Sequence, residues 1–374
     1  MSEKGLKLKH FEQQIAQFIG TKYAVVTGSG RAALKIALRS LEVDGGNVIV
    51  SNLTCAIVPQ IVISAGFRPL FVDINKDLSL NLKPLESNYD KKNRVIIVNY
   101  LYGCPTDDIV GILDFAKDRH LFVIEDATQS FGAKINGRQV GSLGDIGIFS
   151  FPKCFFNLFR GGAITTNDKR LADNAYKYRA QMQDSPNIPS LQFRYFRRSM
   201  PDFVKRLYGA LRQKTRQEAL SPCSYPTGLY KYQETTYPYQ FQGLADLEIK
   251  RGLHTLHSLE KLRAGRMATA RDILGVISDK ADLGLRPLFP YQPDFTYTKN
   301  PVIIESSTLS EWMTCFGSRG IIIDMDYQQA PYNILWCVRS DGQLRGAFHC
   351  DCGDRFKWVP PHKDAIGLGI ARDN

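Results

Sequence analysis

The sequence lacks any apolar run of about eighteen residues or more, the length that a membrane-spanning helix requires, so no spanning helix is expected. Its first residues, MSEKGLKLKHFEQQ, are polar and lack the apolar core of a signal peptide. Internal repeats and low-complexity tracts are also missing. With 44% hydrophobic and 23% charged residues over 374 positions, the composition predicts a soluble globular protein with a sizeable core.

The eight cysteines lack the dense spacing of a disulfide-rich secreted scaffold, so reduced thiols in a cytoplasmic protein are expected. Cys350 and Cys352 beside His349 do not have the spacing of a zinc site. No nucleic-acid-binding motif accompanies the formal net charge of +11. Neither a metal nor a nucleic acid is therefore expected as a partner.

Much of the positive charge lies in one segment, residues 194–216, which holds eight basic side chains and one acid, Asp202. Phe203, Leu207 and Leu211 recur there at intervals of four, which is typical of a basic amphipathic helix. Such a helix can lie on an anionic membrane surface, and a peripheral contact with the inner membrane is one interpretation. The alternative is a solvated helix whose apolar stripe packs on the body of the protein.

Short apolar strands alternate with amphipathic helices over about the first 170 residues. The expected strands are YAVVT, NVIVS, PLFVD, RVIIVNY, LFVIED, DIGIFSF and GAITT, and helices such as AALKIALRSL, AIVPQIVISAG and DDIVGILDFAKDRH lie between them. Nearly continuous apolar strands in this alternation predict an α/β fold with a mostly parallel sheet covered on both faces. Ligands of such sheets bind at the carboxyl ends of the strands.

Two domains are expected. The large domain covers residues 1–237 and includes a basic insertion at about 185–237, where the alternation stops. A smaller C-terminal α/β domain covers 238–374, opening with the long helical pattern from Leu244 and continuing with the runs PVIIE and IIIDM.

The run TGSGRAALKIAL places a Gly-Ser-Gly turn before a helix that begins near Arg31. Backbone N–H groups at such a helix N-terminus suit a phosphate. The run is neither a P-loop nor a GxGxxG fingerprint, and Gly-Ser turns also simply cap helices.

Two acids, Glu125 and Asp126, end the buried strand of VIEDATQSFGA. A buried acid stays ionised when it pairs with a cation or a protonated ring nitrogen. Gln129, three residues after Asp126, can donate a hydrogen bond to an exocyclic oxygen of a ligand. The alternative is an acid that caps the next turn.

Lys153 stands among aromatic residues in FSFPKCFFNLFRGG. A buried ammonium group is costly unless it is paired or loses its proton, and a deprotonated lysine attacks carbonyl groups. The alternative is a lysine that reaches the surface at a turn, with its stem against the phenylalanines.

These runs, with AGFRPLFVDIN, YLYGCPTDD, GRQVGSLGDIGIFSF and GGAITTND, stand in the order and at the spacing of the DegT/StrS family of pyridoxal-phosphate-dependent sugar aminotransferases, which the sequence resembles. The likeness is strong over about 11–179 and weak beyond. It implies the aspartate-aminotransferase fold (PLP fold type I), with a large sheet domain, a small C-terminal domain and a homodimer whose active sites lie at the subunit interface.

The resemblance also implies roles for particular residues toward pyridoxal 5'-phosphate. The amides of Gly30 and Arg31 and the Ser150 hydroxyl would bind the cofactor phosphate. Asp126 would keep the pyridinium nitrogen protonated, and Gln129 would bind the phenolic oxygen. Lys153 would form the internal Schiff base and move the proton between substrate and cofactor.

The sequence departs from the family pattern at several positions. The usual lysine position, five residues after Ser150, is Phe155 here, and Lys153 lies only three after it. Cys55 replaces the aromatic ring that often stacks on the cofactor, and Arg160 replaces the acid before Gly-Gly. The asparagine expected from the partner subunit falls near Phe241 and is not matched.

The same loop supplies two candidate substrate contacts, Asn157 and Arg160. Arg160 could face an anionic group of the substrate, or it could replace a salt bridge.

The resemblance implies an aminotransferase that acts on a keto sugar, nucleotide-linked, with glutamate as amino donor. The product would feed polysaccharide, lipopolysaccharide or antibiotic pathways. The alternatives are a pyridoxal-phosphate-dependent sugar dehydratase and a catalytically silent relative that only binds.

Overall fold

The computed structural model of the chain describes residues 2–181, apart from 56, 76, 88, 107 and 157, and residues 242–304. The basic segment 194–216, the insertion expected at 185–237, the cluster 349–352 and the run IIIDM lie outside these residues.

The helices described are α1 (Glu3–Ile19), α2 (Gly30–Ser40), α3 (Ile57–Ser64), α4 (Lys83–Ser87), α5 (Ile109–Asp118), α6 (Lys169–Ala180), α10 (Asp246–His257) and α11 (Leu259–Ser278), with the 3-10 turns η1 (Leu101–Gly103), η2 (Phe151–Lys153) and η4 (Ala281–Leu283). The strands are β1 (Tyr23–Thr27), β2 (Asn47–Ser51), β3 (Arg68–Val72), β4 (Asn93–Asn99), β5 (Phe122–Asp126), β6 (Lys134–Ile135), β7 (Arg138–Gln139), β8 (Ile146–Ser150), β9 (Gly162–Thr166), β10 (Leu285–Pro287) and β11 (Val302–Ile304). The strands expected from the sequence are confirmed, as β1, β2, β3, β4, β5, β8 and β9.

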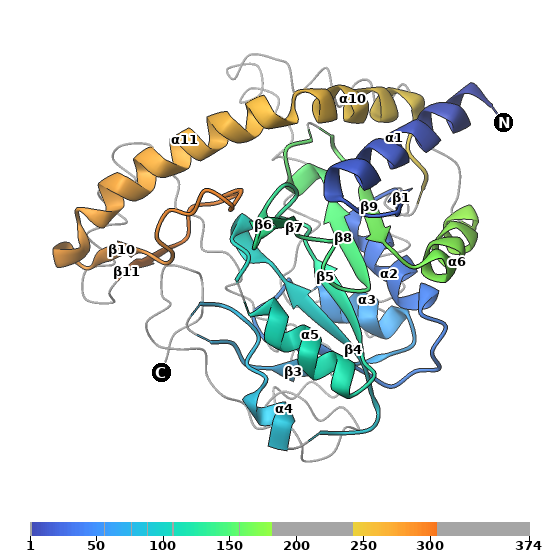
Figure 1. Ribbon diagram of the computed structural model, residues 1–374, viewed down its shortest axis with the longest axis horizontal. Coiled ribbons are helices and arrows are strands. Elements are labelled where there is room, and N and C mark those ends of the chain that lie inside the picture. Colours follow the sequence, from blue (N-terminus) through green and yellow to red (C-terminus); the bar gives the residue numbers. More distant parts are fainter. Residues whose placement is uncertain are drawn as a thin grey trace, which may run out of the picture.

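The central sheet has seven strands in the order β1-β9-β8-β5-β4-β2-β3 (Figure 1). Neighbours from β8 through β5, β4 and β2 to β3 pair in parallel. β9 runs antiparallel to both β8 and β1, so the described sheet is mixed although mostly parallel. Because β9 is reversed, its first residue lies at the edge where β1 and β8 end.

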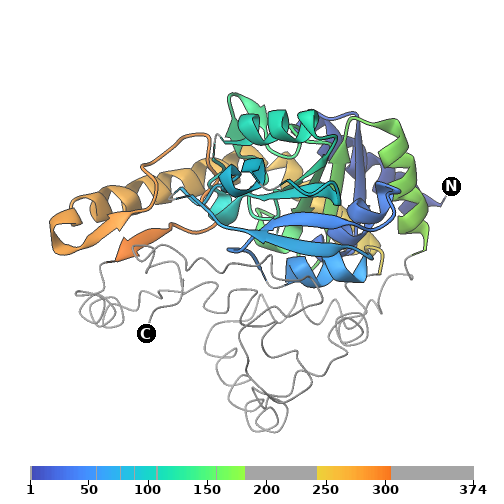
Figure 2. The same cartoon turned by 90° about the horizontal axis from the view of Figure 1, so that it is seen from below.

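The two faces of the sheet are covered by different helices. Along β4, Val95 and Ile97 pack into one apolar cluster, whereas Ile96 and Val98 pack into another. The cluster of Val95 includes α2, α3 and α6, and the cluster of Ile96 includes α1, α5 and α10. Figure 2 shows α3 and α5 on opposite sides of the sheet. The strands are therefore apolar on both faces, as their sequences predicted.

Helix α1 was not among the expected helices, although its signals are present in the sequence. Ser2 caps its N-terminus by accepting a hydrogen bond from the Gly5 amide, and Gly20 ends it with a φ of 79°. Phe11 and Ile15 are fully buried one turn apart. The helix packs beside α10, which comes from the far side of the sequence (Figure 1).

The long helical pattern from Leu244 forms two helices, because α10 ends and α11 begins at Ser258. Leu244, Ile249 and Leu259 belong to the same cluster as α1, so the opening of the predicted small domain packs on the large one. The boundary at 237/238 stays a prediction. None of the helices within 2–181 and 242–304 is long and apolar enough to cross a membrane.

Candidate active site

Four strand ends meet at one edge of the sheet. β1, β5 and β8 end there with Thr27, Asp126 and Ser150, and the reversed β9 begins there with Gly162. These strands are neighbours in the order β1-β9-β8-β5. The sheet therefore brings together the segments that carry most of the predicted site residues.

The turn before α2 forms a close-fitting cradle with β8 and β9. The Ser29 hydroxyl accepts a hydrogen bond from the Ala32 amide at 3.1 Å and so caps α2. A Cβ on Gly30 would lie 2.9 Å from the Cβ of Ser150, and one on Gly162 would lie 2.8 Å from the Gly30 nitrogen. A side chain at either position would therefore have to displace its neighbours in the cradle.

This cradle suits a phosphate group. The positive end of the α2 dipole faces it, and the Gly30 and Arg31 amides lie in the first helical turn. The Ser150 side chain lies in contact distance of Gly30. The three residues predicted to bind the cofactor phosphate are thus brought to one place.

Asp126 is 7% exposed, and the Thr128 amide donates to its Oδ1 at 3.2 Å. Burial raises the pKa of the Asp126 carboxyl, whereas hydrogen bonds from Thr128 and the positive charge of Lys153 act in the opposite direction. The carboxylate of β5 and the ammonium group of η2 are therefore within electrostatic reach of each other. A cation at this place, such as a protonated ring nitrogen, would favour the ionised carboxylate in the same way.

Lys153 ends η2, and its side chain is exposed, although the neighbouring Phe151, Phe155 and Phe156 are buried. Of the two alternatives that the sequence left open, this is the lysine that reaches the surface at a turn, because the rings turn into the core and leave the amine outside it. An exposed amine near Asp126 is accessible to a carbonyl group. Its role as the Schiff-base lysine stays a prediction.

Gln129 is buried, and its side-chain oxygen accepts a hydrogen bond from the Tyr102 amide at 3.0 Å. This bond fixes the orientation of the carboxamide, with its oxygen toward Tyr102 and its NH₂ group, a hydrogen-bond donor, on the other side. Tyr102 has a φ of 61°, which is rare for a residue with a side chain. Tyr102 was not among the residues predicted from the sequence, although the glycine that follows it in YLYGC signals a turn.

The sheet also separates the two acids at the end of β5. The Glu125 carboxylate is fully buried and accepts hydrogen bonds from the Tyr100 hydroxyl and from the amides of Gly141, Leu143 and Gly144. Burial raises the pKa of the Glu125 carboxyl, and these hydrogen bonds oppose the rise. Glu125 therefore organises the loop before β8 and leaves Asp126 as the acid of the site.

The remaining predicted residues differ in their placement. Cys55 is half-buried in the loop after β2, which lies two strands away from β5, and packs on the cluster of α2 and α3. Its contact with the cofactor stays a prediction. Asn157 lies outside the described residues.

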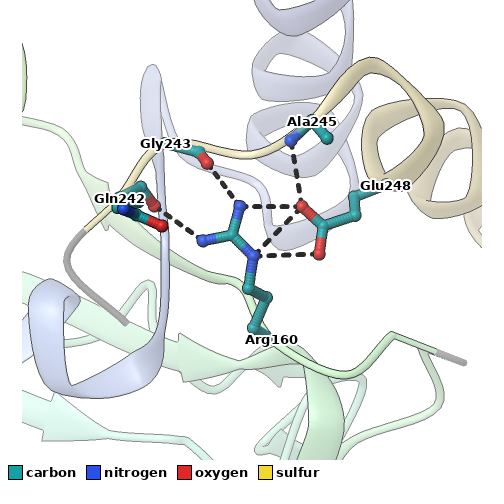
Figure 3. A network of polar contacts seen from close by, with 5 residues as sticks. All are labelled: Arg160, Gln242, Gly243, Ala245 and Glu248. Carbon is teal, nitrogen blue, oxygen red and sulfur yellow. Dashed lines mark hydrogen bonds and ion pairs between the residues drawn. The ribbon is translucent and has the colours of Figure 1, made fainter. Parts of the chain in front are cut away.

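Arg160 is 3% exposed and forms an ion pair with the fully buried Glu248 (Figure 3). The geometry favours the salt-bridge alternative over a substrate contact, because the guanidinium group is enclosed by protein acceptors. Glu248 was missed from the sequence, since it lies 88 residues along the chain from Arg160.

Known proteins resemble this chain over about half of its length. The profile of the DegT/DnrJ/EryC1/StrS aminotransferase family matches residues 1–192. A GDP-perosamine synthase of Escherichia coli O157:H7 is 35% identical over 184 residues, which are 48% of this chain and 50% of that protein. A dTDP-3-amino-3,6-dideoxy-alpha-D-galactopyranose transaminase of Aneurinibacillus thermoaerophilus is 38% identical over 176 residues, 45% of this chain and 47% of that protein. The chain thus matches about half the length of these curated relatives.

Solved structures resemble it over more of its length. Helicobacter pylori PseC, an aminotransferase involved in the biosynthesis of pseudoaminic acid, has a TM-score of 0.67 at 17% identity, covering 98% of this chain and 84% of that one. NtdA of Bacillus subtilis, solved with bound cofactor PMP, has a TM-score of 0.66 at 17% identity, covering 97% of this chain and 70% of that one. The α/β fold is that of the pyridoxal-phosphate enzymes of fold type I, as expected. Since the family profile spans more than half of the chain, the protein belongs to the DegT/DnrJ/EryC1/StrS aminotransferase family.

Proposed function

We propose that this chain is a pyridoxal-phosphate-dependent aminotransferase that moves an amino group from glutamate to the keto group of a nucleotide-linked sugar. The observation that carries the proposal is the buried Asp126 carboxylate at the edge of the sheet where α2 begins and where Gly30 meets Ser150. The names of the relatives, a GDP-perosamine synthase and a dTDP-sugar transaminase, support the substrate class.

Pyridoxal phosphate would supply an electron sink for the negative charge that develops at the substrate carbon. The Gly30 and Arg31 amides would bind its phosphate, and Asp126 would hold a proton on its ring nitrogen. Gln129 would donate a hydrogen bond to its phenolic oxygen. The amine of Lys153 would take the proton from the donor carbon and return a proton on the acceptor side.

The overall transfer balances without a further reactant. Glutamate gives up its amino group and leaves as 2-oxoglutarate, and the keto sugar then receives the amino group in a second half-reaction. The amino sugar would serve polysaccharide, lipopolysaccharide or antibiotic biosynthesis.

The first test is an absorbance spectrum of the protein with pyridoxal phosphate, before and after borohydride reduction, followed by peptide mapping. We expect a visible band that reduction abolishes and a label on Lys153. Lys153→Met should lose the label, whereas the matched variant Lys134→Met, in β6, should keep it. Cofactor binding without a label on Lys153 would contradict its assigned role.

The second test separates transfer from dehydration. Glutamate should bleach the visible band of the loaded protein and release 2-oxoglutarate. A loaded protein that ignores glutamate but eliminates water from a keto sugar would be a dehydratase. A protein that binds no pyridoxal phosphate would be a silent relative, and the proposal would fail.

We further propose a homodimer in which the active site lies at the subunit interface, because the family resemblance implies this assembly. Light scattering should give the mass of a dimer, and a monomer would count against a shared site. We also propose that the basic segment 194–216 makes a peripheral contact with an anionic membrane. Salt-sensitive sedimentation of the protein with anionic liposomes would support this contact, and a lack of such sedimentation would exclude it.

A further inference from the structure

A buried ion pair ties the start of β9 to the start of α10. The Nε of Arg160 donates to both carboxylate oxygens of Glu248, at 3.0 and 3.2 Å, and its Nη2 lies 2.9 Å from Oε2 (Figure 3). Arg160 is 3% exposed and Glu248 is fully buried, so both charges are removed from water. A buried pair of this kind is weak evidence for stability, because desolvation offsets most of the attraction. Its location is therefore more informative than its energy.

The pair also fixes the backbone ahead of α10. The Nη1 of Arg160 donates to the carbonyl oxygen of Gln242 at 3.0 Å, and Nη2 donates to that of Gly243 (Figure 3). The Glu248 carboxylate accepts a hydrogen bond from the Ala245 amide at 2.9 Å. One guanidinium group and one carboxylate thus bind the backbone of three residues directly ahead of α10.

On its other side, Arg160 adjoins the cradle. The next residue, Gly161, donates its amide to the Gly28 carbonyl at 2.8 Å and accepts from the Phe151 amide at 3.0 Å. A Cβ on Gly161 would lie 2.6 Å from the Phe151 ring and 3.4 Å from Leu244, so the segment held by Arg160 packs directly on this residue. Gly28 begins the turn before α2, and Phe151 begins the η2 turn that ends at Lys153.

We propose that Arg160 and Glu248 are positioning residues of the cofactor site. By clamping the approach to α10 over Gly161, they fix the hydrogen bonds of Gly161 and thereby the relative position of the phosphate cradle and the Lys153 turn. The inference rests on the proposed function, because it assigns the pair a role in holding the phosphate of pyridoxal phosphate.

The test compares the affinity of the apo-protein for pyridoxal phosphate with its affinity for pyridoxal, which lacks the phosphate. In Arg160→Met we expect the dissociation constant for pyridoxal phosphate to rise about tenfold or more, as for the loss of one hydrogen bond to a charged group, while that for pyridoxal stays nearly constant. Glu248→Gln should act in the same direction. A general loss of stability would not change the ratio of the two constants.

The matched control is a second ion pair, Arg179 with Glu12, which is partly buried and joins α6 to α1. Arg179→Met should lower stability but leave the ratio unchanged. Denaturant unfolding of each apo-protein establishes that the variants are folded. Should Arg160→Met not fold, Arg160→Lys keeps the charge but cannot reach Glu248 and both carbonyl oxygens together, and it should show the same change in a smaller amount.

The outcomes separate the two proposals. A wild-type protein that binds no pyridoxal phosphate would overturn the proposed function. A wild-type protein that binds it, with folded Arg160 and Glu248 variants of unchanged ratio, would overturn the positioning role alone. The same change of ratio in Arg179→Met would also overturn it, since the effect would then follow from any broken ion pair.

Discussion

Replacing Gly30 by alanine should weaken cofactor binding without unfolding the protein. The added Cβ would lie 2.9 Å from the Cβ of Ser150 and 3.3 Å from its Oγ. Ordinary carbon contacts begin at about 3.5 Å, so the start of α2 and the end of β8 must separate by about 0.6 Å. An amide-to-phosphate hydrogen bond of about 2.9 Å would then approach about 3.5 Å, where little of it remains.

The size of the effect follows from the loss of one hydrogen bond to a charged group, about 1.5–3 kcal/mol. The dissociation constant for pyridoxal phosphate should therefore rise about 10- to 100-fold. Fluorescence titration of the apo-protein measures the constant, and urea unfolding measures the stability in parallel. Inorganic phosphate, titrated as a competitor, should show the same loss.

Gly265→Ala provides the control, because a Cβ at this position of α11 meets no atom within 4 Å. It should stabilise the fold by about 0.5–1 kcal/mol and leave the dissociation constant unchanged. If Gly30→Ala binds the cofactor as tightly as Gly265→Ala does, the cradle does not hold the phosphate.

Three other changes test the site and its surroundings. Asp126→Asn should slow the reaction with glutamate by about 10- to 100-fold in stopped-flow absorbance, because an amide cannot pair with a protonated ring nitrogen as a carboxylate does; an unchanged rate would exclude this role. Burial raises the pKa of the Cys154 thiol to about 11. Below pH 11, iodoacetamide should therefore label the half-buried Cys55 faster than Cys154, and the labelling rate of Cys154 should rise until the pH reaches about 11. Equal labelling of the two cysteines by peptide mapping would refute this. Burial also raises the pKa of Glu125, so its ionisation should lower the free energy of unfolding as the pH rises above its ordinary pKa of 4.5. Glu125→Gln should abolish this pH dependence and also lose hydrogen bonds to the loop. A variant whose stability has the same pH profile as the wild type would contradict this.

The strands of the large domain could be predicted because their signal is local. β2 and β4 are runs of Val and Ile bounded by polar residues, and a strand buried on both faces allows little else. The placement of Gly30 at a helix start and of Asp126 at a strand end could also be predicted, because both stand in ordered runs. The reversed direction of β9 was not visible, since GAITT has the same composition as a parallel strand.

The residues that escaped prediction depend on contacts distant in sequence. Nothing in RGG or DLEIK indicates that Arg160 and Glu248 meet, because the contact arises only when α10 folds back beside α1. The exposure of Lys153 was one of two alternatives that the sequence left open. Its aromatic neighbours indicate burial of the segment, but in a 3-10 turn successive side chains point in different directions, so one can leave the core while the others enter it.

The reversed strand β9 has a consequence for how this site can vary. The segment 151–161 leaves the sheet at the end of β8 and returns at the start of β9, so both of its ends are anchored at the same edge. Such a segment can gain or lose a residue without shifting the register of any strand, because its two anchors stay paired as Ser150 with Gly162. The reach of its lysine is therefore set by the path of the segment across the edge and not by a fixed count from Ser150. The fold can therefore accommodate a different spacing between Ser150 and the lysine. The strand ends that carry the other site residues keep their positions when that spacing changes.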